Sequence, residues 1–410
     1  MAVGPHVFPE MFPVKGIELG VVEAGVKYSN RKDLVLFAAE SGARVAGVFT
    51  LNAFCAAPVH IAKAHLKQLQ AQQGQPFYLL INTGNANAGT GQQGFEDANL
   101  CCSAVADAAG VNSNQILPFS TGVIGETLPS DKICSAVPRA LDQLNFASWR
   151  GAAEGIMTTD TRPKGASVQV EYDGETITIT GISKGAGMIK PNMATMLCFI
   201  ATDAGIPQDL LKTLSQELAD QSFNRITIDG DTSTNDACML IATGKSSASE
   251  VDTAHPDYPA LKDALRVVYQ ELAHAIVRDG EGATKFVSVI VENARSKAEA
   301  LDVAYTIAHS PLVKTALFAS DPNWGRILAA LGRAPIEGFD LSKVSIYLGD
   351  VLLVENGGRA ATYTEEQGQA EVNQQDIDIR IDLARGDVCE TVWTTDLSHE
   401  YVTINAEYRT

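Results

Sequence analysis

Hydrophobic and polar residues alternate in several short segments of the chain, and this spacing predicts β-strands. In residues 168–180, two alternating runs flank Asp173-Gly174, a pair typical of the tight turn of a β-hairpin. Residues 377–383 carry Ile or Leu at every second position with charged residues between them, so one face of that strand should meet water. The run Met196–Ala201 is apolar throughout, which indicates a strand buried on both faces. Further strands are expected at residues 34–38, 45–50, 77–82 and 286–291, with a closing pair of strands at 392–407.

Other segments repeat their apolar residues every three to four positions, which predicts amphipathic helices. Pro58 suits the first turn of one of them, and Ser296 is placed as the N-cap of another. Because strands and helices are mixed along the chain and several strands form hairpins, the sequence predicts a layered α+β fold rather than a doubly wound parallel sheet. The predicted helices are residues 59–72, 95–109, 207–222, 258–277 and 296–308.

The composition narrows the class of protein. The formal net charge of −18 over 410 residues argues against a nucleic-acid partner, because phosphate binding needs clustered Lys and Arg. The seven cysteines form no CxxC pair, so neither a disulfide framework nor a zinc site is expected, and no metal is predicted. The amino terminus has no apolar segment typical of a secretory signal, and no apolar run is long enough to span a bilayer. We therefore expect a cytoplasmic protein without a membrane partner.

The segment Lys184–Leu197, KGAGMIKPNMATML, carries the most informative candidate chemistry. Thr195 follows a small residue and precedes the buried strand. A threonine hydroxyl needs a base beside it, and its own α-amino group can serve, but only if the chain is cut between Ala194 and Thr195. The segment therefore suggests a precursor that cleaves itself to create an amino-terminal nucleophile. The alternative is a structural threonine inside a core strand.

Other small and polar segments are candidates for the rest of a site. Residues 89–94 match GxGxxG, but they do not turn directly from strand to helix, so no dinucleotide cofactor is expected. Ser120–Gly125 places small residues after an apolar strand, which suits an oxyanion hole with the Thr121 hydroxyl as a donor. Residues 229–236 are predicted to be a polar loop lining an active site rather than a calcium loop. Glu281, flanked by glycines in residues 279–285, could orient an ammonium group or relay protons.

Together these segments resemble the ornithine acetyltransferase family of arginine biosynthesis, also called glutamate N-acetyltransferase (ArgJ type). The resemblance covers nearly the whole chain, and its blocks occur in the family's order. The matching blocks are NTGNANA (82–88), STGVIG (120–125), MTTDTRPK (157–164), residues 184–197, DGDTSTND (229–236), DGEGATK (279–285), DPNWGR (321–326) and residues 401–410.

The resemblance implies an αββα sandwich with an amino-terminal nucleophile threonine after self-cleavage at Ala194-Thr195. It further implies an α chain of residues 1–194 and a β chain of residues 195–410, whose carboxyl terminus closes the site, paired in an α2β2 heterotetramer. Thr195 would carry acetyl from N2-acetylornithine to glutamate in ping-pong fashion, without a cofactor, although acetyl-CoA could also serve as donor. Thr121 and Gly122 match the family's oxyanion positions. The substrate-contacting positions match Thr161, Lys184, Thr195, Glu281, Asn405 and Thr410.

Two alternatives remain open on the residues alone. An amidohydrolase or aminopeptidase of the same fold would lose the acyl group to water instead of glutamate. A binding module that does not cleave would keep Thr195 as a structural residue.

Overall fold

A computed structural model describes residues 2–5, 7–190 and 196–407 of the chain. These residues form two compact units. The larger unit contains Val7–Asn224 and Asp231–Ile276. The smaller unit contains Arg225–Gly230 and the chain from Val277 onward, together with the amino-terminal residues.

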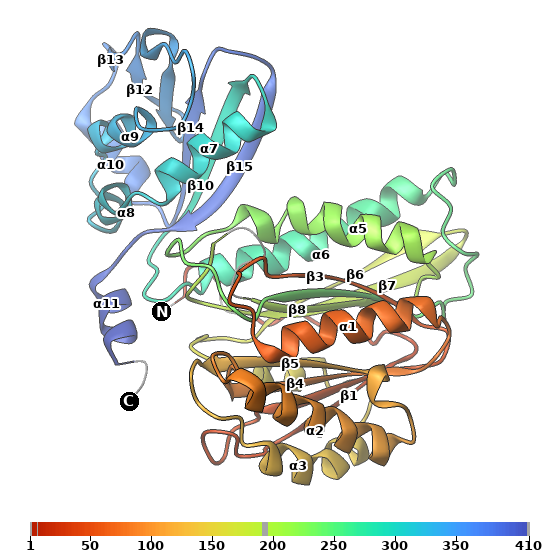
Figure 1. The fold of residues 1–410 in the computed structure, drawn as a ribbon. Helices are drawn as coiled ribbons and strands as arrows, with labels where there is room; N and C mark the ends of the chain where they lie inside the picture. The colour runs from red at the N-terminus through yellow and green to blue at the C-terminus, as the bar shows by residue number, and fades with distance from the viewer. Residues whose placement is uncertain (1, 6, 191–195, 408–410) are drawn as a thin grey trace. The chain divides into compact units, whose positions relative to one another are not determined.

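The larger unit contains two mixed β-sheets (Figure 1). In the first sheet β4 and β5 are parallel, and in the second β8 and β9 are parallel, whereas the other pairings are antiparallel. The first sheet, in the order β1-β2-β4-β5, consists of Ile17–Val22, Leu34–Ala39, Phe77–Asn85 and Ile116–Val123. The second sheet, in the order β3-β9-β8-β7-β6, consists of Arg44–Phe49, Ala237–Ala242, Leu197–Thr202, Glu175–Lys184 and Lys164–Tyr172.

The two sheets pack face to face around one hydrophobic core. The ring of Phe199 on β8 lies 5.4 Å from that of Phe37 on β2 and 5.1 Å from that of Phe119 on β5, between ring centroids. Helices α1 (Ala57–Ala71) and α4 (Trp149–Gly155) contribute apolar side chains to the same core. Pro58 occupies the first turn of α1, as predicted.

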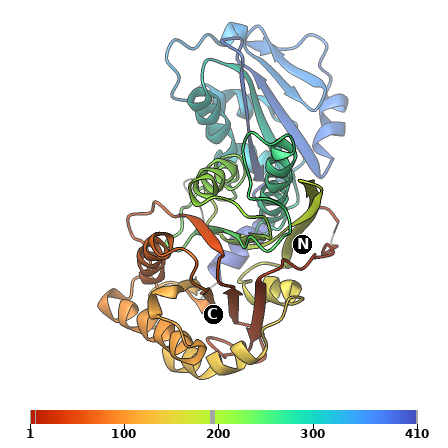
Figure 2. The ribbon, with the colours of Figure 1, turned by 90° about the vertical axis from the view of Figure 1, so that its right-hand side faces the viewer.

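Helices cover the outer faces of both sheets. On the first sheet these are α2 (Gly91–Ala109) and α3 (Ser130–Asp142), whose apolar residues join a second core with β2 and β4 (Figures 1 and 2). On the second sheet they are α5 (Gln208–Asp220) and α6 (Tyr258–Arg278), and α6 belongs to this unit up to Ile276. The resulting helix–sheet–sheet–helix order confirms the predicted αββα sandwich.

Strand β8 occupies the centre of the second sheet, between β7 and β9, and all of its residues are buried. This confirms the prediction from its uninterrupted apolar run. The predicted hairpin is also confirmed: β6 and β7 pair around Asp173-Gly174, and both turn residues have positive φ.

The smaller unit is built on a third sheet with its own hydrophobic core. In β14 every second residue is buried, as its alternating sequence predicts. Ser296 caps α7 by accepting a hydrogen bond from the backbone N–H of Glu299, also as predicted. The sheet order is β13 (Gly358–Arg359), β12 (Val351–Glu355), β11 (Ser345–Leu348), β14 (Asp376–Asp382), β10 (Phe286–Ala294) and β15 (Val388–Thr395). The helices are α7 (Lys297–Ala308), α8 (Pro311–Phe318), α9 (Trp324–Leu331), α10 (Glu365–Val372) and α11 (His399–Ala406).

The prediction for residues 392–407 is wrong in its second half, because β15 is followed by a helix rather than a strand. Ser398 is the physical reason. Its hydroxyl caps α11 by accepting from the backbone N–H of Tyr401, and it donates to the Gly282 carbonyl oxygen at 2.7 Å. The carboxyl-terminal element is therefore fixed at its amino end to the loop of residues 279–285.

Lys314 on α8 is a buried cation of the smaller unit. Its Nζ donates to Thr394 Oγ1 at 3.0 Å and to the Thr395 carbonyl oxygen. Burial lowers the pKa of Lys314 to about 8, although the carboxylates of Asp396 and Asp229 act to raise it.

This lowered pKa predicts a pH-dependent stability. Between pH 8 and 10.5 the unfolded chain binds a proton at Lys314 that the folded chain has lost, so the free energy of unfolding should rise with pH in this window, by about 3 kcal/mol in total. We expect Lys314→Met to remove this rise, measured by urea unfolding at several pH values across the window. The exposed Lys343→Met is the control, and an unchanged pH slope in Lys314→Met would contradict the prediction.

No helix in the described part of the chain is both long and apolar enough to cross a membrane.

Candidate active site

Two glycines fix the backbone where β4 and β5 end. Gly84 and Gly122 are paired across these parallel strands. Gly122 has a φ of 137°, and a Cβ atom on it would lie 2.3 Å from the Gly84 carbonyl carbon and 2.5 Å from the Asn85 nitrogen. Only glycine can occupy position 122 without moving the neighbouring backbone. Thr121, directly before it, is therefore held on a rigid strand end.

Asparagine side chains secure this region by binding backbone carbonyl groups. Asn82 Nδ2 donates to the Asn85 carbonyl oxygen at 2.9 Å. Asn235 Nδ2 donates to the carbonyl oxygens of Ala86 and Ser120, at 2.6 and 2.9 Å. Buried backbone carbonyl groups need such partners. Asn82 of the NTGNANA block and Asn235 of the block 229–236 thus hold the strand ends in place.

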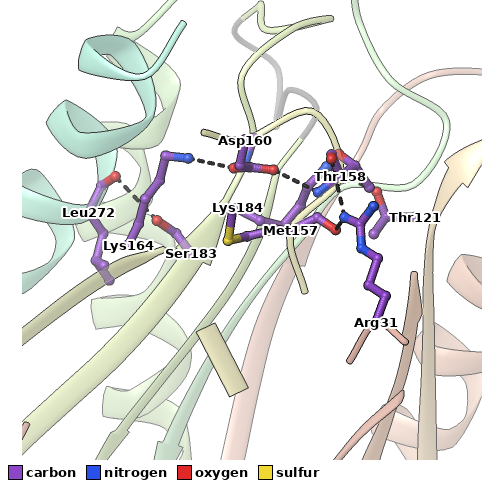
Figure 3. A network of polar contacts seen from close by, with 10 residues as sticks. Arg31, Thr121, Met157, Thr158, Asp160, Lys164, Ser183, Lys184 and Leu272 are labelled. Atoms are coloured by element: carbon purple, nitrogen blue, oxygen red, sulfur yellow. Dashed lines mark hydrogen bonds and ion pairs between the residues drawn. The ribbon is translucent and has the colours of Figure 1, made fainter. Parts of the chain in front are cut away.

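Lys184, the last residue of β7, joins the two sheets at this point. Its side chain is buried, and Nζ donates to Thr121 Oγ1 at 3.0 Å (Figure 3). Because the Thr121 oxygen accepts from the ammonium group, its own hydrogen is available to donate elsewhere. The pair thus combines an O–H donor with an adjacent positive charge.

Asp160 forms a buried anionic centre next to this pair (Figure 3). Oδ1 accepts from Lys164 Nζ at 2.5 Å and from the Gly185 backbone N–H at 2.7 Å. Oδ2 accepts from the Thr158 N–H at 2.9 Å. Burial acts to raise the pKa of Asp160, but the charges of Lys164 and Lys184 and the Gly185 N–H outweigh it, so the pKa lies below its ordinary value. Asp160 is therefore an ionised anchor for the residue after Lys184.

Arg31 holds the loop that carries Asp160 and Thr161. Its guanidinium donates to the carbonyl oxygens of Met157 and Thr158, at 2.6 and 3.2 Å. Thr161 itself is exposed. Figure 3 shows Arg31 reaching this loop close to Thr121. The structure thus places Thr121, Lys184 and the loop preceding Thr161 in one region of the larger unit.

Asp236 binds the backbone immediately downstream of the predicted cleavage point. Its Oδ1 accepts from the Met196 N–H at 2.9 Å, and the residue is 1% exposed. Burial raises the pKa of the Asp236 carboxyl well above its ordinary value, against the opposing effects of the Met196 N–H, the Ser233 hydroxyl and the charge of Lys184. The polar loop 229–236 thus does reach the start of β8.

Glu281 and Asn405 are brought together in the smaller unit, although 124 positions separate them in the chain. Asn405 Nδ2, on α11, donates to Glu281 Oε2 at 2.7 Å. Gly282, with a φ of 69°, allows this approach, since a Cβ atom there would lie 2.5 Å from Ser398 Oγ. The structure therefore brings Asn405 of the carboxyl-terminal segment to the glycine-flanked glutamate.

Three predicted site residues, Ala194, Thr195 and Thr410, lie outside the described residues. The larger unit contains Thr121, Gly122, Thr161 and Lys184, and the smaller unit contains Glu281 and Asn405. Within the described residues, no group of three His, Cys, Asp or Glu side chains is placed to hold a metal ion.

Sequence reasoning missed several residues of the site. Arg31 gave no signal, because the carbonyl groups that it binds lie 126 and 127 positions away and meet it only in the fold. Lys164 lies only four positions after Asp160, but nothing in the block 157–164 marks the two residues as a buried ion pair. Asp236 ends the acidic block 229–236, but nothing in the sequence distinguishes it from Asp229 or Asp231. Its placement follows from the parallel pairing of β8 with β9, which brings residue 236 beside residue 196.

Comparisons with known proteins agree on one family for this chain. A model described as the ArgJ family matches residues 18–410. The arginine biosynthesis bifunctional protein ArgJ of Pseudomonas fluorescens (strain Pf0-1) is 59% identical over 411 residues, which cover 100% of both chains.

Two solved structures were also matched. The arginine biosynthesis bifunctional protein of Bacillus halodurans is 36% identical, with a TM-score of 0.48 over 50% of this chain and 95% of that one. The ornithine acetyltransferase of Mycobacterium tuberculosis, complexed with ornithine, is 31% identical, with a TM-score of 0.36 over 44% of this chain and 92% of that one.

Proposed function

Since the chain belongs to the ArgJ family, we propose that it transfers an acetyl group from N-acetylornithine to glutamate in arginine biosynthesis. The full-length similarity to an arginine biosynthesis protein supports this reaction and does not favour the hydrolase or the binding module. The structural observation that carries the proposal is the buried Lys184–Thr121 pair beside Gly122, because acyl transfer needs fixed donors for a developing oxyanion.

The nucleophile in this proposal is Thr195, freed by self-cleavage after Ala194. In the precursor its hydroxyl attacks the Ala194 carbonyl carbon, the C–N bond breaks as the hydroxyl proton passes to nitrogen, and water then hydrolyses the ester. The amine formed in this way acts as base for the same hydroxyl. Thr195 next attacks the acetyl carbonyl of N-acetylornithine, releases ornithine, and passes the acetyl group to the amine of glutamate. Two half-reactions on one nucleophile give ping-pong kinetics.

We assign substrate contacts to the residues that match the family's substrate-contacting positions. Lys184 supplies positive charge for the carboxylate of either substrate, and Thr161 lies in the neighbouring loop. Glu281, held by Asn405, suits the side-chain ammonium of ornithine. Thr410, at the carboxyl terminus, is proposed as a further substrate contact.

The strand order of the second sheet supports two chains that stay associated after cleavage. Strands β3, β6 and β7 precede position 194, whereas β8 and β9 follow it, and all five belong to one hydrogen-bonded sheet. An α chain of residues 1–194 and a β chain of 195–410 would thus share a buried core. We propose that two such pairs form an α2β2 heterotetramer in the cytoplasm.

The test combines electrophoresis with a paired donor assay. Purified protein should give two bands on a denaturing gel, with the second fragment beginning Thr-Met-Leu-Cys. N-acetylornithine and glutamate should yield ornithine and N-acetylglutamate, and the same assay with acetyl-CoA decides whether it is also a donor. Active protein that runs as one full-length band would overturn the self-cleavage mechanism, and acetate release without transfer would indicate the hydrolase.

Replacing Thr121 tests the oxyanion assignment. Thr121→Ala removes one donor, so kcat should fall by about 10²–10³-fold with little change in KM. Thr121→Ser keeps the hydroxyl and is expected to retain most of the activity. Equal activity of the alanine and serine variants in the steady-state assay would argue against this role.

A further inference from the structure

We propose that Arg31 is a specificity-determining residue of this active site: its guanidinium binds the side-chain carboxylate of the acceptor, glutamate. This role depends on the proposed function above, because only that reaction brings a dicarboxylate to Lys184 and Thr121. Donor and acceptor differ at the ends of their side chains, since N-acetylornithine carries an ammonium group there and glutamate a carboxylate. A site that takes both in turn needs a separate partner for each group.

The fold fixes Arg31 at the end of the sandwich where the oxyanion residues lie. It precedes β2 by a short segment in which the Asp33 carbonyl oxygen accepts from the Thr83 N–H at 3.0 Å. Thr83 on β4 is the register partner of Thr121 on β5. The Asp33 carboxylate closes the loop before β2 by accepting from two of its backbone N–H groups, both at 2.6 Å. Arg31 therefore extends from a rigid support, and Figure 3 shows its guanidinium beside Thr121.

The guanidinium of Arg31 uses only part of its hydrogen-bonding capacity. Nη2 donates to the carbonyl oxygens of Met157 and Thr158, at 2.6 and 3.2 Å, which fixes the orientation of the group. Nε and Nη1 donate to no acceptor in the described part of the chain, and no carboxylate there forms an ion pair with Arg31. The side chain is half-buried, so it has lost part of its hydration but remains accessible to a ligand. Arginine N–H groups bind carboxylates through charge-assisted hydrogen bonds, which are stronger than neutral ones.

The charges around Arg31 favour an anionic ligand. In the network of Figure 3 the cationic side chains are those of Arg31, Lys164 and Lys184, whereas the carboxylate is that of Asp160. That carboxylate already accepts from Lys164 and from two backbone N–H groups. The chain as a whole has a formal net charge of −18, so this local excess of positive charge is a property of the site. It complements glutamate, which has two carboxylates and one amine.

Glutamine is the probe that isolates the contact, because it has the shape of glutamate but carries an amide in place of the side-chain carboxylate. We expect the wild-type enzyme to prefer glutamate over glutamine as acetyl acceptor, measured as the ratio of their kcat/KM values. In Arg31→Met this ratio should fall by about 10–100-fold, as is typical for the loss of a hydrogen bond to a charged group. The value of kcat/KM for N-acetylornithine, which reports the first half-reaction alone, should change little.

The ratio also separates substrate recognition from a structural role. Arg31 holds the loop of residues 157–158, and damage to that loop would lower kcat/KM for both acceptors and for the donor together, leaving the ratio unchanged. The control is Lys32→Met, which removes the exposed positive charge at the next position and should keep the wild-type ratio.

Each outcome decides between the possibilities. A folded Arg31→Met protein whose ratio lies within about threefold of the wild-type value would overturn the role of Arg31, and so would a wild-type enzyme that accepts both amino acids equally. If Arg31→Met does not fold, Arg31→Gln, which keeps an amide donor for the loop carbonyl groups but no charge, is judged by the same ratio. A wild-type protein that transfers acetyl to neither acceptor would refute the proposed function itself, whatever the variants do.

Discussion

Replacing Thr195 by alanine is expected to leave a single 43.6 kDa chain that transfers no acetyl group. Without the hydroxyl, nothing attacks the Ala194 carbonyl, so neither the cut nor the free amine forms. Loss of a nucleophile that acts together with its base costs up to about 10⁶-fold in kcat, and here both groups are lost at once. The measurements are denaturing electrophoresis, intact mass, and the N-acetylornithine–glutamate assay.

Two controls make this result specific. Thr195→Ser keeps a hydroxyl and should still cleave and turn over, at a reduced rate. Thr176→Ala changes an exposed threonine on β7 and should behave like the wild type. A Thr195→Ala protein that appears as two chains, or that retains transfer activity, would show that the nucleophile lies elsewhere.

Replacing Asp160 by alanine is expected to lower the free energy of unfolding by about 3–5 kcal/mol, because it leaves buried charges without their partner. The side chains of Asp160 and Lys164 are 0% and 1% exposed, so water cannot compensate for the loss. The Gly185 N–H also loses its acceptor, which should disturb Lys184 and the oxyanion region. Urea unfolding and steady-state kinetics of the same preparation measure both effects.

The control for this variant is Asp209→Ala, which removes a fully exposed carboxylate and should change stability little. The stability that the Asp160–Lys164 ion pair contributes also depends on pH. Since the pKa of Asp160 is lowered on folding, its stabilisation is present above the ordinary value of 3.8 and is lost as the pH falls through the lower folded-state pKa. An Asp160→Ala protein as stable as Asp209→Ala at neutral pH would contradict the assignment.

The main elements of the sandwich could be predicted from local patterns. The hairpin around Asp173-Gly174, the buried run after Met196 and the Ser296 cap each depend on residues that are neighbours in the chain. Such signals do not need the rest of the fold. The same reasoning failed at residues 396–407, because the alternation there is weak and the helix is fixed by a distant partner, the Gly282 carbonyl oxygen.

In the candidate site, too, some residues could be predicted from the sequence and others only from the fold. The reactive types were evident in the sequence: a threonine after a small residue, a Thr-Gly pair at a strand end, and a glutamate between glycines. Two of their supporting residues were not, because Arg31 and Asp236 bind backbone groups 126 and 40 positions away, separations that no spacing rule covers.

The sequence by itself determined which chemistry is available and which segments form strands and helices, since both follow from residue type and local periodicity. Only the tertiary structure decided which buried charges meet. Lys184 reaches Thr121 because β7 and β5, in different sheets, end at the same place, and Asp236 reaches Met196 because β9 runs parallel to β8. These contacts depend on how sheets pack and pair, and a linear pattern does not contain that information.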